Sequence, residues 1–178
     1  MRATISVRHE VRQALAGAVR ALRRHQHELE FAQPEELQAA DPAGARLACQ
    51  QLHAAGAALA GLPQPARLAQ AMGAAVQRLM REPQLCTAQA VVVLEKSAVA
   101  LLQHLDRLAQ DPHASCVPLF PQYRDVQALA GVERPHPAEL WAAPARQAEP
   151  AMPGAVALAL DAATRTRLDA AMLPVLKS

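Results

Sequence analysis

Aromatic residues are almost missing from this sequence, in which they account for 2% of the 178 residues. Strand-forming β-branched and aromatic side chains are scarce, whereas alanine, leucine, glutamine and arginine dominate. The abundant residue types favour helices, so the composition predicts an all-α protein and argues against a β-sheet fold. The length suits one compact domain with an extension.

Cysteine is rare as well. Cys49, Cys86 and Cys116 are odd in number and widely spaced, and no two of them form a Cys-x-x-Cys pair. This pattern argues for a reducing compartment and against a structural zinc site, so we interpret the cysteines as small core residues. His25 and His27 stand two apart on an expected helix and point to opposite sides, which prevents them from chelating one metal ion. The sequence predicts no metal and no cofactor.

Long apolar runs and a strong charge of one sign are also missing. No stretch approaches the roughly 18 to 20 apolar residues of a membrane span, and the first residues alternate arginine with apolar residues, unlike a signal peptide. We therefore expect a cytoplasmic protein. The formal net charge is +2, so the overall balance predicts neither nucleic-acid binding nor membrane insertion.

Helical periodicity accounts for most of the chain. Turn-forming residues separate the periodic segments: Asp41 and Pro42 fit a helix start, Gly61 and the prolines of 62–65 end one helix before the next, and Gly131 closes another. The expected helices span residues 3–31, 43–60, 65–81, 86–110, 118–131 and 155–176.

Three regions follow from this division. Residues 1–131 are expected to form an antiparallel four-helix bundle with an additional short fifth helix. Residues 132–154 are rich in proline and should form an irregular strap packed on the bundle, with one helical turn at 137–141. Residues 155–178 are expected to form a C-terminal helix.

The first expected helix carries a basic face. Its leucines recur every seven residues, and arginines flank this stripe within one half of the helical wheel. The face is either the solvated side of an ordinary bundle helix or a docking surface for an acidic partner. The arginines considered for docking are Arg8, Arg12, Arg20 and Arg23.

Residues 50–61, QLHAAGAALAGL, contain the clearest candidate for chemistry. A histidine followed within one helical turn by a glycine is typical of the phosphate-accepting helix of histidine phosphotransfer (Hpt) domains. Their His-x-x-Lys-Gly motif supplies a nucleophile, a cation one turn later that neutralises the phosphoryl oxygens, and a glycine that leaves room for the partner.

Two registers fit this motif, and each loses a part of it. If Gly56 is the motif glycine, Leu52 holds the acceptor position and Ala55 the lysine position. If His53 is the acceptor, Gly56 holds the lysine position and Ala57 the glycine position. Neither register keeps a cation beside the imidazole, although the helical wheel places His53 on the polar side and predicts that it is at least partly exposed.

Two further polar residues interrupt the apolar segment 86–110. His104 is expected at the boundary of the core. Glu95 is interpreted as a buried or partnered carboxylate with a structural rather than a catalytic role. No Ser-His-Asp arrangement, glycine-rich phosphate loop or paired-carboxylate site can be recognised by spacing.

The sequence resembles the N-terminal, phosphotransfer-like domain of histidine kinases that control type IV pili and twitching motility, the PilL/ChpA-type relatives of the chemotaxis kinase CheA. The resemblance covers about residues 1–141. It rests on LHAAGAALAGL with the following LAQAMGAAVQRL helix, on VVVLEKSAVALLQHLDRL, and above all on LFPQYRDVQALAGVERPHPAELW at 119–141.

The resemblance implies a cytoplasmic, multidomain kinase whose ATPase region is absent from this chain, and it implies that the C-terminal helix at 155–178 begins a following module. The most N-terminal modules of such kinases are often degenerate, and the incomplete His-x-x-Lys-Gly motif fits that pattern, so we expect a non-catalytic interaction or scaffold module. The alternative is an active phosphotransfer domain that carries a phosphoryl group on His53. The implied partners are proteins of a chemosensory phosphorelay: the kinase core, response regulators or pilus-hub proteins. Phe120, Tyr123 and Trp141 either pin the strap to the bundle or form a docking cluster.

Overall fold

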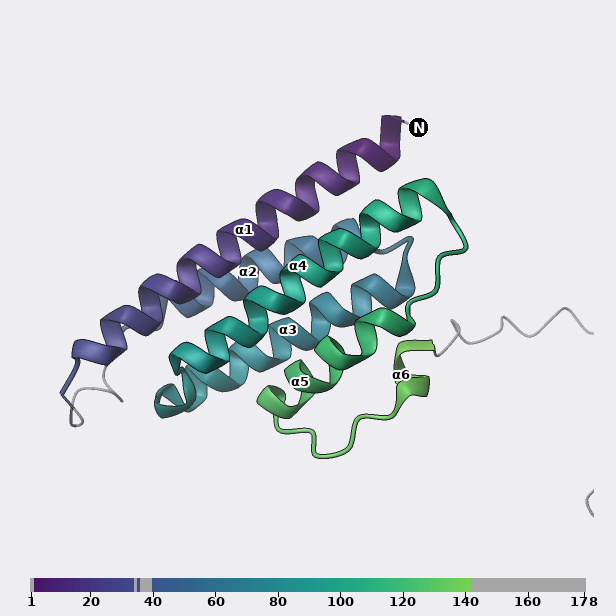
Figure 1. Cartoon of the computed structure of the whole chain (residues 1–178). Coiled ribbons are helices and arrows are strands. Elements are labelled where there is room, and N and C mark those ends of the chain that lie inside the picture. The colour runs from purple at the N-terminus through teal and green to yellow at the C-terminus, as the bar shows by residue number, and fades with distance from the viewer. Residues whose placement is uncertain (1, 34, 36–39, 142–178) are drawn as a thin grey trace, which may run out of the picture. The chain divides into compact units, whose positions relative to one another are not determined.

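The computed structural model describes residues 2–33, 35 and 40–141, and in this part of the chain every regular element is a helix (Figure 1). The prediction of an all-α fold is therefore confirmed for these residues. The expected helix at 155–176, and the strap beyond residue 141, lie outside the described residues. The α-helices are α1 (Arg2–Phe31), α2 (Ala43–Ala58), α3 (Pro63–Arg81), α4 (Ala88–Gln110), α5 (Phe120–Ala130) and α6 (Pro137–Trp141), with 3₁₀ turns η1 (Pro83–Leu85) and η2 (Val117–Leu119).

Local chemistry explains where these helices begin and end. Pro63 opens α3, where its missing N–H would have no helical acceptor in any case. Thr87 caps α4 because its side-chain oxygen accepts a hydrogen bond from the N–H of Ala90 at 3.2 Å. Gly131 ends α5 with φ of 90°, a left-handed conformation that suits glycine.

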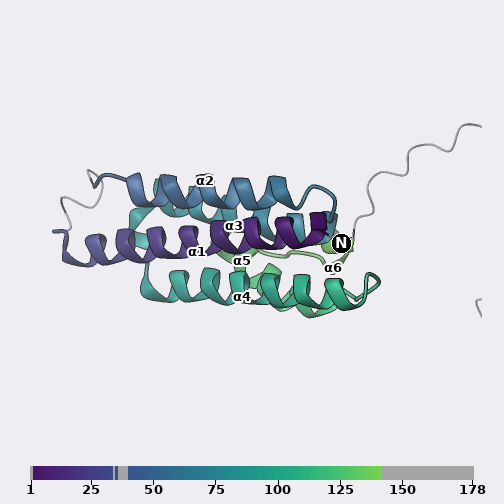
Figure 2. The same cartoon turned by 90° about the horizontal axis from the view of Figure 1, so that it is seen from above.

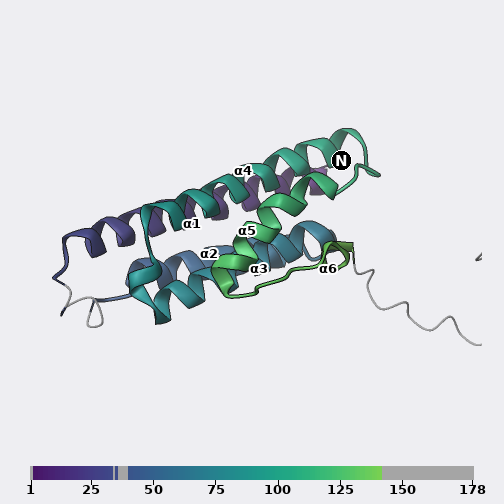
Figure 3. The ribbon, with the colours of Figure 1, turned by 60° about the horizontal axis from the view of Figure 1, so that its bottom comes forward.

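The long helices α1 to α4 lie side by side (Figures 1 and 2). The closest packing joins α1 to α2 and α2 to α3, and α1 also packs on α4. Helix α5 packs on both α3 and α4 and lies across the side where these two helices meet (Figure 3). None of the described helices combines the length and apolar character needed to cross a membrane.

Leucine and alanine make up most of the core. The leucines fill volume, and the small residues let helix backbones approach closely. One such close approach is at Gly44 of α2, where an added Cβ would lie 2.9 Å from the Cβ of His25 and 3.0 Å from the carbonyl oxygen of Ala21, both on α1. The fully buried leucines include Leu15, Leu22, Leu52, Leu59, Leu68, Leu79, Leu94 and Leu101.

Two histidines are buried in this core. His25 on α1 and His104 on α4 expose 3% and 2% of their surface, and the Nδ1 atom of each lacks a hydrogen-bond partner among the described residues. His104 was expected at the core boundary, and this expectation is wrong because it faces inward with Leu101 and Leu105. Burial lowers the pKa of both imidazoles; Glu28 and Asp41 oppose this effect at His25, while Arg107 adds to it at His104.

Acid is therefore expected to destabilise the fold. Because the folded-state pKa values lie below the unfolded value of about 6.5, the unfolded chain takes up protons first as the pH falls. The free energy of unfolding should be retained above about pH 6.5 and decline below it, through the lowered pKa values. Urea denaturation at several pH values measures this decline. His104→Leu should make the free energy of unfolding decline less as the pH falls, whereas the exposed control His113→Gln should leave the decline unchanged. An equal decline in both variants would contradict the prediction.

Candidate functional site

The candidate site is built on the outer side of α2. His53 is exposed on this helix, as its place on the helical wheel predicted. Leu52 and Ala55 are buried in the core and expose 1% and 0% of their surface. Gly56 is partly buried.

The burial of Leu52 and Ala55 excludes one of the two motif registers. With Gly56 in the motif glycine position, the acceptor and lysine positions fall on Leu52 and Ala55, both inside the core. A residue there cannot meet the active site of a partner protein. Only the register that starts at His53 places its acceptor, lysine and glycine positions at residues that solvent reaches.

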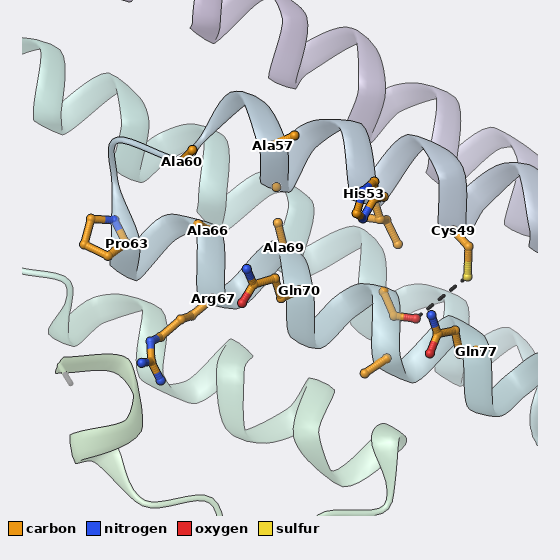
Figure 4. A pocket seen from close by; sticks show the side chains of 14 residues that line it. Cys49, His53, Ala57, Ala60, Pro63, Ala66, Arg67, Ala69, Gln70 and Gln77 are labelled. Atoms are coloured by element: carbon orange, nitrogen blue, oxygen red, sulfur yellow. Dashed lines mark hydrogen bonds between the residues drawn. The ribbon is translucent and has the colours of Figure 1, made fainter. Parts of the chain in front are cut away.

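An open groove of about 820 Å³ runs beside His53, between α2 and α3 (Figure 4). Small residues form most of its lining, so the backbones of both helices are accessible to a bound partner. His53, Gln70 and Gln77 supply polar side chains, and Arg67 is the only lining residue with a permanent charge. The lining residues are Cys49, Leu52, His53, Gly56, Ala57, Ala60, Pro63, Ala66, Arg67, Ala69, Gln70, Gly73, Ala74 and Gln77.

The charge of Arg67 is directed away from His53. Its side chain extends from α3 toward α6, where Nη1 donates a hydrogen bond to the carbonyl oxygen of Glu139 at 2.7 Å (Figure 4). One turn beyond His53, α2 carries only Gly56 and Ala57. The described groove therefore presents no cation positioned to neutralise a phosphoryl group on the imidazole.

Helix α6 is attached to α5 by a hydrogen-bond network. The Tyr123 hydroxyl donates to the Glu139 carboxylate at 3.0 Å and accepts from the Gln127 amide at 2.8 Å. The other Glu139 oxygen accepts from the N–H of His136, the residue before α6. These bonds, first from His136 and then from Tyr123, lower the pKa of the Glu139 carboxyl.

The predicted aromatic docking cluster is only partly at the surface. Tyr123 exposes 5% of its surface, and Phe120 is half-buried against the core. The Trp141 side chain lies outside the described part of the structure. Tyr123 thus holds α6 in place, while its use as a docking residue stays a prediction.

The arginines of α1 divide into two groups. Arg8 pairs with Asp106 of α4 at 2.6 Å, and Arg23 forms a two-pronged pair with Glu95 of α4, in which Nη2 donates to Oε2 at 2.8 Å. Glu95 therefore has the partner expected for a structural carboxylate. Arg12 and Arg20 are exposed and form no ion pair within the described residues. Half of the predicted basic face is thus paired within the protein.

The three cysteine side chains differ in their exposure to solvent. Cys86 and Cys116 are buried, in line with their interpretation as core residues, but Cys49 is only partly buried and lines the groove. Sequence reasoning missed this position, although Cys49 and His53 stand one helical turn apart. Among the described residues, no three histidine, cysteine, aspartate or glutamate side chains gather to hold a metal ion.

Comparison with known protein families, with curated proteins and with solved structures finds no match for this chain.

Proposed function

We propose that this chain is an Hpt-like antiparallel four-helix bundle, made of α1 to α4, that serves as a non-catalytic interaction or scaffold module. The sequence resemblance suggests its setting, a cytoplasmic chemosensory histidine kinase that controls type IV pili and twitching motility. Its partners would be the kinase core, response regulators or pilus-hub proteins of that phosphorelay.

One observation carries the non-catalytic part of this proposal: among the described residues, no cation lies beside the exposed imidazole of His53. A phosphoryl group carries about two negative charges at neutral pH, and its transfer between proteins relies on nearby positive charge to stabilise them. Gly56 and Ala57 occupy the positions one turn along, and Arg67 is bonded to α6. The described surface therefore has an exposed helix beside a groove, but it lacks the positive charge that would stabilise a phosphoryl group on His53.

A phosphorylation assay tests this proposal. The chain would be incubated with ATP and the kinase core of a pilus chemosensory kinase, and acid-labile phosphate would be measured. We expect no label above that of His53→Gln. The double variant Gly56→Lys, Ala57→Gly restores the motif around His53, and label in this variant alone would show that the missing cation is the cause.

The second candidate function is phosphoryl transfer through His53, favoured by the exposure of that side chain on the groove. Robust labelling of the unmodified chain that is lost in His53→Gln would establish this function and overturn the first. Circular dichroism of both variants would show that the helices are intact.

The interaction role has its own test at the groove. Ala57→Arg places a long side chain into the groove, whereas Ala54→Arg adds the same side chain at an exposed position of α2 outside the lining. Binding to the purified kinase core and response regulators would be measured by titration calorimetry. We expect Ala57→Arg to weaken binding by at least about tenfold and Ala54→Arg to leave it nearly unchanged. Equal effects of both variants would place the docking surface elsewhere.

A further inference from the structure

Two sulfur atoms meet at the end of the groove where α2 and α3 pack. The Cys49 Sγ of α2 lies 3.9 Å from the Met80 Sδ of α3. The same thiol lies 3.8 Å from the carbonyl oxygen of Gly73, the contact drawn in Figure 4. Cys49 is a free thiol and is partly open to solvent. A thiol and a thioether are therefore held side by side from two different helices.

A third metal-binding group stands one turn from this pair. His53 follows Cys49 by four residues, a spacing that brings two helical side chains onto one face. Because His53 is exposed, its imidazole can turn about its side-chain bonds toward the Cys49 sulfur. Both residues line the groove (Figure 4), and His53 has no hydrogen-bond partner in the described part of the chain that would hold it elsewhere.

The separation of the sulfurs suits a shared metal ion. Two sulfurs bound at about 2.3 Å in a trigonal site lie about 4 Å apart, close to the observed contact. Thiolate and thioether ligands select soft ions such as Cu(I), and imidazole is also a copper ligand. The groove lining contains no carboxylate, the ligand type that harder ions such as Mg²⁺ require.

We propose that Cys49, Met80 and His53 form a binding site for a soft monovalent metal ion of the Cu(I) class. On binding, a bond forms between the ion and the Cys49 sulfur, and the thiol proton leaves to solvent. The Met80 thioether and a neutral His53 imidazole donate lone pairs, and no group is oxidised or reduced. The site does not depend on the phosphotransfer-like assignment of the bundle.

Proton release gives the site a pH dependence. The Cys49 thiol must lose its proton to bind the ion as a thiolate. Each bound ion should therefore release about one proton, and the affinity should increase with pH.

The test is an anaerobic titration of the whole chain with Cu(I) against bicinchoninate as a competing chelator. We expect one ion per chain. Cys49→Ser should weaken binding by at least about 100-fold, and Met80→Leu and His53→Gln by at least about tenfold each. The buried Cys116→Ala and the exposed His113→Gln serve as controls and should change the affinity by less than about twofold.

Two outcomes would overturn the site. If Met80→Leu and His53→Gln both bind Cu(I) like the unmodified chain, the metal is held by a thiol alone. If Cys49→Ser still binds one ion tightly, the ligands lie elsewhere. Alkylation with iodoacetamide, followed by mass spectrometry, gives a second readout that needs no variant: bound Cu(I) should protect Cys49, and equal modification with and without the ion would reject the proposal.

Discussion

Leu52→Ala is expected to lower the free energy of unfolding by about 2 to 5 kcal/mol. Leu52 exposes 1% of its surface on the core side of α2, next in sequence to His53. The core around it is rich in alanine, and such short side chains cannot extend into the space that the leucine leaves. The cost therefore includes the lost burial of the side chain and an unfilled cavity.

Leu47→Ala is the matched control for this variant. Leu47 lies on the same helix and exposes 47% of its surface, so its truncation should change the free energy of unfolding by no more than about 0.5 kcal/mol. Urea denaturation of both variants at neutral pH measures the difference. Equal losses would show that Leu52 is no more buried than Leu47. Leu52 could then no longer be excluded as the phosphoacceptor position.

The helices could be predicted from the sequence because their signals are local. The leucines of α1 recur with helical periodicity, and prolines and glycines mark most of the helix ends. The ends differ by a few residues from expectation. Helix α2 stops at Ala58, where 43–60 was expected, and α4 starts at Ala88, because Thr87 rather than an earlier residue supplies the cap. The short α6 at 137–141 was also expected from its sequence.

The candidate site was less predictable, because much of it depends on contacts between helices. The exposure of His53 follows from its own position on α2, so the helical wheel sufficed. The groove, the redirected Arg67 and the contact of Cys49 with Met80 need the pairing of α2 with α3, which periodicity does not specify. The burial of His104 was not predicted for a similar reason, because it depends on the neighbouring helices that enclose the side chain.

Gly44 has a structural role that composition alone does not reveal, and it positions the helix that carries the candidate site. An added Cβ would meet the Cβ of His25 at 2.9 Å and the carbonyl oxygen of Ala21 at 3.0 Å. Neither is the free end of a flexible side chain, so α1 and α2 would have to move apart. Gly44→Ala is therefore expected to lower the free energy of unfolding by about 1 to 3 kcal/mol, despite the better helix propensity of alanine.

Gly73→Ala gives the opposite expectation and serves as the control. Gly73 lies in the middle of α3, and an added Cβ would have no neighbour within 4 Å among the described residues. Alanine should raise the free energy of unfolding there by up to about 1 kcal/mol, because it restricts the unfolded chain without a clash. Chemical denaturation of the two variants under the same conditions measures both effects. If Gly44→Ala also stabilises the protein, α1 and α2 do not approach as closely as these distances require.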